Sequence, residues 1–288
     1  MLQGTPVYDI CSISGDDQND LLISRFAPYL SEHKNLSAAH RHSFYHLVFF
    51  TSGGGYHNID FESFTVKPYQ IYFMIPGQVH SWNFEGITDG YVINFSASFF
   101  NSFLFNQVQP EGFSFFNGHA KTSVINLPDD LQGKAENLFE DIIAEYGKKT
   151  VHHQEMLRLL MLQLFILVDR LNVQNQHTGP VPYNQTLLRN FQKLLEVNFT
   201  RLKLPKDYAE LLYITPNHLN ALCKALLGMQ AGEVIRNRVL LEAKRLLINP
   251  GLNITQITFQ LNFNDNSYFT KFFKKFEGIT PEEFRKKF

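Results

Sequence analysis

Four histidines in the N-terminal part of the chain have the chemistry and the spacing to form one site. His40, His42 and His46 are separated by even numbers of residues, so their imidazoles would share one face of an extended strand. His80 follows later, after Pro76-Gly77. Imidazoles that converge on a cavity can bind a divalent transition metal. They can equally serve as hydrogen-bonding groups that line an organic ligand pocket or sit satisfied in the core.

A second set of polar side chains lies on one face of a helix predicted near the C-terminus. Asp265 is a good N-cap, because its carboxylate can accept from backbone N–H groups two or three residues later. An apolar stripe at helical spacing follows it, formed by Tyr268, Phe269, Phe272, Phe273 and Phe276. The opposite face carries Asn266, Ser267, Thr270, Lys271, Lys274 and Lys275. Such groups can contact bases and phosphates of DNA, although any solvated helix face can also be basic.

The same pattern occurs 50 residues upstream, where Leu219, Cys223, Lys224 and Gly228 match Phe269, Phe273, Lys274 and Gly278. Thr215-Pro216 begins this predicted helix. Its inner residues are Leu219, Leu222, Cys223 and Leu226, and its outer residues are Asn217, His218, Asn220, Ala221 and Lys224. A short helix precedes each amphipathic helix. The short helix before the C-terminal one is expected to bury Ile254, Ile257, Phe259 and Leu261. A long helix over about 230–248 joins the two pairs, so the sequence predicts two helix-turn-helix units.

Charge is distributed unevenly along the chain, whose formal net charge is −1. Residues 181–288 contain 16 Lys and Arg against 9 Asp and Glu, whereas residues 1–180 contain 10 against 18. The basic C-terminal part is therefore expected to meet a polyanion. The acidic N-terminal part would be repelled by DNA, which confines the contact to the C-terminal part.

The stretch from about 183 to 288 resembles the AraC family of bacterial transcription regulators and their seven-helix, double helix-turn-helix domain. The residues that carry the resemblance are Ile257, Phe263, Asp265, Ser267, Tyr268, Phe269, Phe272, Lys274, Lys275, Gly278, Thr280, Pro281, Phe284 and Arg285. Asn262 stands where the family usually has Gly, and it can still take the positive φ of the turn. Thr258 replaces a usual Ala, and Ala221 replaces a long polar side chain, so the first unit has fewer groups that can hydrogen-bond to bases.

The resemblance implies a DNA-binding regulator and not an enzyme, with double-stranded DNA and RNA polymerase as partners. The expected base contacts are Asn217, Asn220, Asn266, Ser267, Thr270 and Lys271, and the expected phosphate contacts are Lys224, Lys274 and Lys275. The second helix of each helix-turn-helix unit would enter a major groove of the DNA, and successive major grooves recur about 34–36 Å apart.

The N-terminal part is predicted to contain short strands near 22–27, 43–51, 55–61, 63–67, 70–75 and 90–96, which favours a barrel or sandwich. Gly53-Gly54-Gly55 is one of the expected breaks between strands. The histidine pattern partly resembles the cupin barrel, whose usual Glu is replaced by His46, and such barrels are the sensor domains of many AraC-family members. The fold class is therefore α+β multidomain, with a cupin-like N-terminal barrel followed by helices and an all-α C-terminal domain.

The barrel interior is the expected effector pocket, lined by His42, Phe44, His46, His80 and Trp82. A small-molecule effector is favoured over a metal or other cofactor, and His40, His42, His46 and His80 are the candidates if a metal binds. The main alternative is a metal-dependent cupin enzyme or metal sensor fused to a DNA-binding domain. A second alternative is a barrel that serves only to dimerise, which an interior filled with Phe side chains would favour.

Two helices are predicted after the barrel, over 129–146 and 151–171. In the second, Leu157, Leu160, Leu164, Leu167 and Leu171 form a heptad-like seam. A further stripe of Met156, Leu159 and Ile166 predicts burial on a second side, against the twin helix of a homodimer, unless the helix is buried only within its own domain.

The predicted domains are residues 1–172 and 183–288, with a polar linker containing Gly and Pro over 173–182. Cys11 and Cys223 have no disulfide or metal spacing, and the N-terminus has no signal-peptide pattern. The longest apolar run is too short to span a bilayer. We therefore expect a cytoplasmic protein without a membrane partner.

Overall fold

The computed structural model describes residues 6–14, 20–101, 110, 113–116, 118, 120–148, 150–173, 183–249 and 251–287. These residues form two compact units, one on each side of residues 174–182. Apart from Val173, the linker predicted at 173–182 lies outside the described residues.

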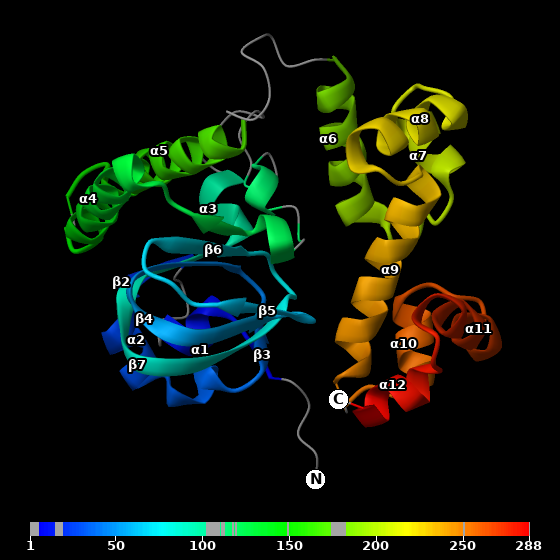
Figure 1. The fold of residues 1–288 in the computed structure, drawn as a ribbon, viewed down its shortest axis with the longest axis horizontal. Coiled ribbons are helices and arrows are strands. Elements are labelled where there is room, and N and C mark those ends of the chain that lie inside the picture. Colours follow the sequence, from blue (N-terminus) through cyan, green and yellow to red (C-terminus); the bar gives the residue numbers. More distant parts are fainter. Residues whose placement is uncertain are drawn as a thin grey trace. The chain divides into compact units, whose positions relative to one another are not determined.

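The N-terminal unit is built on one curved, mixed sheet that wraps around an interior and has the cupin-like form expected (Figure 1). Its strands are β1 (Val7–Tyr8), β2 (Leu21–Arg25), β3 (His40–His42), β4 (Tyr45–Ile59), β5 (Glu62–Thr65), β6 (Gln70–Met74), β7 (Val79–Phe95) and β8 (Val124–Asn126). The strand order is β1-β3-β7-β4-β6-β8, with β2 also paired to β7 and β5 to β4.

The long strands β4 and β7 pair along almost their whole length, from Tyr45 opposite Phe95 to Ile59 opposite His80. The prediction of a break at Gly53-Gly54-Gly55 is therefore wrong, because these glycines lie inside β4, where the register shifts. Gly55 has a φ of 94°, and a Cβ at this position would lie 2.2 Å from the backbone oxygen of Asn83. Glycine thus lets β4 bend across its neighbour without ending. Sequence patterning also missed the first part of β7, of which it predicted only 90–96.

Alternate residues of β4 face two different hydrophobic cores. Leu47 and Phe49 point outward to a Phe-rich core that includes residues of α4 (Asp129–Tyr146) and α5 (His153–Val173). Val48 and Phe50 point into the barrel, where they pack with Phe26 and Trp82. Up to Phe50, the even-numbered residues of this strand, His46 among them, are therefore placed inside, as their parity predicts. Beyond the register shifts the parity reverses, and Ile59 belongs to the interior core.

Short helices complete the N-terminal unit: α1 (Ile10–Ser14), α2 (Phe26–Glu32) and α3 (Ala97–Asn101), with 3-10 turns at Lys34–Ser37, Ser114–Phe116 and Ala120–Thr122. Phe26 and Tyr29 of α2 are buried in the barrel interior. The sequence predicted α4 and α5 but none of these short helices, which have too few turns to show a period.

The C-terminal unit is all helical (Figure 1). Its helices are α6 (Tyr183–Asn198), α7 (Pro205–Leu211), α8 (Pro216–Leu227), α9 (Ala231–Leu247), α10 (Ile254–Gln260), α11 (Asn266–Glu277) and α12 (Pro281–Lys287). The long helix α9 contributes to two cores: Val234 and Ile235 pack with α7 and α8, whereas Val239 and Ala243 pack with α10 and α11. Among the described helices of both units, none is long and apolar enough to cross a membrane.

Candidate functional site

The second helix-turn-helix unit consists of α10, a tight turn and α11, and local side chains fix both helix starts. Asn253 and Gln256 form a reciprocal capping box at the start of α10. Asn262 in the turn has the expected positive φ, of 53°. The Asp265 carboxylate accepts from the Tyr268 N–H at 2.7 Å, and Gly278 ends α11 with a φ of 83°.

The first unit, α7 and α8, is built in the same way. The Thr215 hydroxyl accepts from the His218 N–H at 3.2 Å, Pro216 occupies the first turn, and Gly228 ends α8 with a φ of 75°. The two second helices therefore begin and end at equivalent places. This equivalence is the structural form of the 50-residue repeat.

On α11, the central aromatic residues are buried and the polar face is free. Phe269 and Phe273 are fully buried, whereas Thr270 is half-buried and the remaining residues on the outer face are exposed: Asn266, Ser267, Lys271, Lys274 and Lys275. The inner stripe is narrower than predicted, because Tyr268 and Phe276 flank it and are 58% and 38% exposed. Phe259 of α10 was likewise predicted to be buried, but it is 69% exposed.

On α8, Leu219, Leu222 and Cys223 are buried, and Asn217, His218, Ala221 and Lys224 are exposed. Leu226 was predicted to lie inside, but it is 42% exposed, because it falls at the edge of the buried face. The four lysines at positions 224, 271, 274 and 275 make no ion pair with an acidic group in the part of the chain that the structure describes. They are therefore available to an external anion.

Two of the predicted base-contact asparagines also have hydrogen bonds within the protein. Asn220 is half-buried, and its Oδ1 accepts from the Ala231 N–H at 3.1 Å at the start of α9. Asn266 remains exposed, and its Nδ2 donates to the Thr255 hydroxyl at 2.8 Å. Asn220 therefore helps to position α9, whereas Asn266 is held on the exposed face by its neighbour.

Ion pairs fix the helices behind these faces. Arg238 of α9 donates to both oxygens of Glu196 at 3.0 and 2.8 Å, and to Glu242 at 3.1 Å. Lys244 of α9 pairs with Glu277 of α11 at 2.5 Å. Because α9 is tied in this way to α6 and to α11, it can hold the two helix-turn-helix units of the C-terminal part in a fixed arrangement.

In the N-terminal unit, the barrel interior contains a cluster of histidines. His40 Nε2 lies 3.1 Å from His42 Nε2, which lies 2.8 Å from His80 Nε2. His57 Nε2 lies 3.1 Å from His80 Nδ1, and His46 Nδ1 lies 2.5 Å from Asn94 Oδ1. The structure thus brings together the four histidines singled out from the sequence. It adds His57, which sequence patterning missed because it belongs to the distant end of β4.

Burial keeps these imidazoles neutral at neutral pH. It lowers the pKa of His40 to about 4, despite the hydrogen bond to the Ala38 carbonyl. It lowers the pKa of His46 to about 3, although Asn94 favours the charged ring. Desolvation, reinforced by neighbouring histidines, also holds the pKa values of His42, His57 and His80 well below 6.5. Each ring therefore has one nitrogen lone pair that can accept a hydrogen bond or bind a metal.

The five predicted pocket residues do lie together, and they are tightly packed. The His42 ring centroid is 4.4 Å from that of Phe44 and 4.8 Å from that of His46. Trp82 lies 5.0 Å from His80, and its indole nitrogen is buried without a hydrogen-bond partner. All five side chains are at most 5% exposed, so an organic ligand of any size would have to displace some of them.

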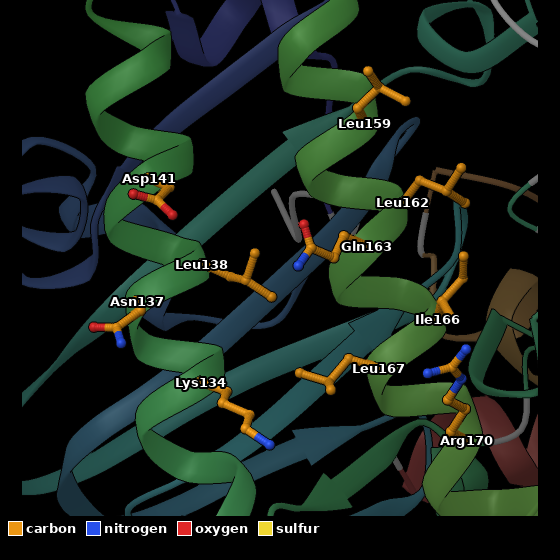
Figure 2. A pocket seen from close by; sticks show the side chains of 10 residues that line it. All are labelled: Lys134, Asn137, Leu138, Asp141, Leu159, Leu162, Gln163, Ile166, Leu167 and Arg170. Atoms are coloured by element: carbon orange, nitrogen blue, oxygen red, sulfur yellow. The ribbon is translucent and has the colours of Figure 1, made fainter.

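A surface groove of about 560 Å³ lies between α4 and α5 in the N-terminal unit (Figure 2). Leu159, Leu162, Ile166 and Leu167 of α5 line it, facing Leu138 of α4. Charged side chains of both signs stand around this apolar strip: Lys134, Asp141 and Arg170. Leu159 and Ile166 are 49% and 40% exposed, so the second stripe of α5 is not buried within its own unit.

Two family models match the chain. Residues 26–165 match the AraC-like ligand binding domain, and residues 208–287 match a helix-turn-helix domain. The transcriptional activator RhaR of Yersinia pseudotuberculosis is 20% identical over 254 residues, covering 86% of this chain and 84% of that protein. The uncharacterized regulatory protein YesN of Bacillus subtilis is 33% identical over 95 residues, covering 32% of this chain and 26% of its own.

Solved structures are similar as well. Fatty-acid-bound ToxT of Vibrio cholerae has 13% identity and a TM-score of 0.43, covering 94% of this chain and 96% of its own. The C-terminal domain of the response regulator yesN of Fusobacterium nucleatum has 27% identity and a TM-score of 0.32, covering 35% and 98%. Since the ligand-binding and helix-turn-helix models match in that order and span most of the chain, the protein belongs to the AraC family of DNA-binding transcription regulators, with an N-terminal ligand-binding domain.

Proposed function

We propose that this regulator reads DNA with the exposed faces of α8 and α11, one in each of two successive major grooves. The observation that carries the proposal is the repeated construction of the two helices, each buried on one side and free on its polar, basic side. Asn217, Asn266, Ser267, Thr270 and Lys271 are the proposed base contacts. Asn220 remains a proposed base contact, but only its amide NH₂ can reach a base, because its Oδ1 accepts a hydrogen bond from the start of α9.

The proposed phosphate contacts are Lys224, Lys274 and Lys275. The DNA phosphate backbone that these lysines would bind carries no sequence information. The side-chain amide and hydroxyl groups of the base contacts, in contrast, can distinguish bases. The two classes of residue should therefore give different phenotypes when they are replaced. Binding sites selected from random duplex DNA with the wild-type protein supply the probe.

We expect Asn266→Ala to change the selected sequence, with a loss of discrimination of about 1–3 kcal/mol at one base pair. Lys275→Ala should instead weaken binding to all duplexes similarly and reduce the slope of log K against log salt by about 1. Titrations followed by fluorescence anisotropy at several salt concentrations measure both effects. Lys121→Ala in the N-terminal unit removes the same charge and should change neither. If Lys275→Ala leaves affinity and slope intact, the phosphate assignment is wrong.

The same proposal includes a homodimer formed through the groove between α4 and α5. An isologous contact needs one surface that complements itself. This groove offers an apolar centre on α5, and its rim carries Lys134 and Arg170 as well as Asp141. A two-fold related copy could cover the exposed leucine and isoleucine side chains and pair the charges of opposite sign.

The double variant Leu159→Asp, Ile166→Asp is expected to convert the dimer to monomer, because it would bury two carboxylates in an apolar contact. Both side chains are about half exposed, so each chain should still fold. Sedimentation equilibrium measures the mass. Val151→Asp is the matched control, since Val151 is 84% exposed and does not line the groove. A wild-type protein that stays monomeric at all concentrations would exclude this interface.

We further propose that ligand binding in the barrel shifts the equilibrium between DNA-binding states, to the extent that the ligand prefers one of them. In this proposal the protein acts on RNA polymerase in the cytoplasm and has no catalytic activity of its own. The support is that the similar protein RhaR is a transcriptional activator. The histidine cluster is then a ligand site and not an active site.

A further inference from the structure

Three imidazole nitrogens in the barrel, from His40, His42 and His80, lie within 4.8 Å of one another. The Nε2 atom of His42 is 3.1 Å from Nε2 of His40 and 2.8 Å from Nε2 of His80. The side chains come from paired strands, since His40 of β3 lies opposite His80 of β7. His40, His42 and His80 are 0%, 3% and 2% exposed, respectively, so water does not compete for these nitrogens.

Hydrogen bonds alone cannot satisfy this arrangement. A ring nitrogen has one in-plane position, which holds either a proton or a lone pair. His40 Nδ1 lies 2.7 Å from the Ala38 carbonyl oxygen and must donate to it, so the neutral ring has its lone pair on Nε2. His42 Nε2 can then either donate its proton to His40 or accept a proton from His80, but it cannot do both. Its own Nδ1 is buried without a hydrogen-bond partner.

We propose that Nε2 of His40, His42 and His80 binds one divalent transition-metal ion. At a metal–nitrogen distance of about 2.1 Å, two nitrogens at right angles around a metal are about 3.0 Å apart. The observed separations of 3.1 and 2.8 Å fit such neighbouring ligands. The ion would accept the lone pairs on these three Nε2 atoms, which hydrogen bonds between the rings cannot all satisfy. Three imidazoles suit Zn²⁺, Ni²⁺, Co²⁺ or Fe²⁺, whereas Mg²⁺ and Ca²⁺ prefer oxygen ligands.

The groups behind the ligands support the same assignment. Histidines that bind metals almost always donate their other ring N–H to an acceptor, which fixes the ring orientation. The Ala38 carbonyl serves His40 in this way, and His57 Nε2, 3.1 Å from His80 Nδ1, serves His80. His46 donates its Nδ1 proton to Asn94, so its Nε2 carries a further lone pair, which is buried without a partner. The His46 ring centroid lies 4.8 Å from that of His42.

This site differs from the pattern expected of a cupin metal centre in two respects. His46 occupies the place of the carboxylate, so the charge of the ion is not reduced by an anionic ligand from that position. His57, which no sequence pattern indicated, is recruited as a positioning residue. The assignment goes beyond the DNA contacts proposed above and does not depend on them, because it is tested by metal binding alone.

The experiment is a titration of the full, untagged, chelator-treated chain with Co²⁺, followed by its visible ligand-field absorption and by displacement with Zn²⁺. We expect one equivalent of Co²⁺ to bind and to be displaced by one equivalent of Zn²⁺. His42→Ala should abolish stoichiometric binding. His57→Phe should retain the site but weaken it about 10–100-fold, as expected for loss of a group that orients a ligand. His152→Ala, which removes a histidine with an 81% exposed side chain, should bind as the wild type does.

Two outcomes overturn the proposal. One is a wild-type chain that holds no stoichiometric Co²⁺ or Zn²⁺ after dialysis. The other is a His42→Ala protein, folded by circular dichroism, that still holds one equivalent. If His42→Ala fails to fold, X-ray absorption of the zinc-loaded wild type decides, because fewer than three imidazoles around the metal contradict the assignment. DNA affinity measured on the same samples separates a failed metal site from failed DNA recognition.

Discussion

Phe273→Ala should destabilise the C-terminal unit by about 3–5 kcal/mol and abolish DNA binding at temperatures where the wild type is folded. Phe273 is fully buried, and its ring centroid lies 6.1 Å from that of Phe269 and 5.4 Å from that of Phe284. Its removal leaves a cavity in the core that joins α9 to α10, α11 and α12. The polar face of α11 would then no longer be held in place, although none of its own residues had changed.

The composition of the chain allows the two units to be observed separately. Trp82 is the only tryptophan and lies in the barrel, so its fluorescence reports unfolding of the N-terminal unit. Phe273→Ala should shift the helical circular-dichroism transition to lower denaturant concentration and leave the Trp82 transition in place. Phe259→Ala is the matched control, because Phe259 is 69% exposed and its loss should change stability by less than about 0.5 kcal/mol. Equal effects of the two substitutions would contradict the assigned core.

Gly90→Ala should have the opposite signature, with a loss of about 3–5 kcal/mol confined to the N-terminal unit. Gly90 has a φ of 155°, and a Cβ there would lie 1.9 Å from the backbone oxygen of Phe49 in the neighbouring strand. Because the clash is with backbone, the strands β4 and β7 would have to separate. The Trp82 transition should therefore move, while DNA affinity per folded C-terminal unit stays the same.

A glycine in α4 provides the control for Gly90→Ala. Gly133 is helical, and a Cβ added to it meets no other atom within 4 Å. Gly133→Ala should raise stability by up to about 1 kcal/mol, because alanine favours the helix. A Gly90→Ala protein as stable as the wild type would show that the close approach of the strands is not required.

The C-terminal unit was largely predictable because its signals are local. Asp265 and Thr215 were recognised as helix caps and Gly228 and Gly278 as helix ends, and each acts within a few residues of its own position. The faces of α8 and α11 follow from helical spacing for the same reason. Spacing could not show that Tyr268 and Phe259 are exposed, since this depends on which neighbouring helix covers the edge of each stripe.

The barrel was predicted in class but not in detail, because its determinants are contacts between distant residues. Three consecutive glycines ordinarily mark a turn, and only the pairing with β7 shows that β4 continues through them. His57 joins the histidine cluster because its strand lies beside Trp82 and His80 in the sheet register. Asn220 was likewise predicted only as a base contact, since its bond to Ala231 forms only when α8 and α9 meet.

The two helix-turn-helix units of this chain are similar in construction but present different side chains, with Asn217, His218 and Ala221 on α8 where α11 has Ser267, Tyr268 and Lys271. A single chain that uses both units therefore has a head and a tail along the DNA axis. Its binding site would be asymmetric, and a symmetric palindrome would not be required within one chain. Inverting such a site in a promoter would turn the bound protein end for end, so that orientation as well as position becomes part of the regulatory signal.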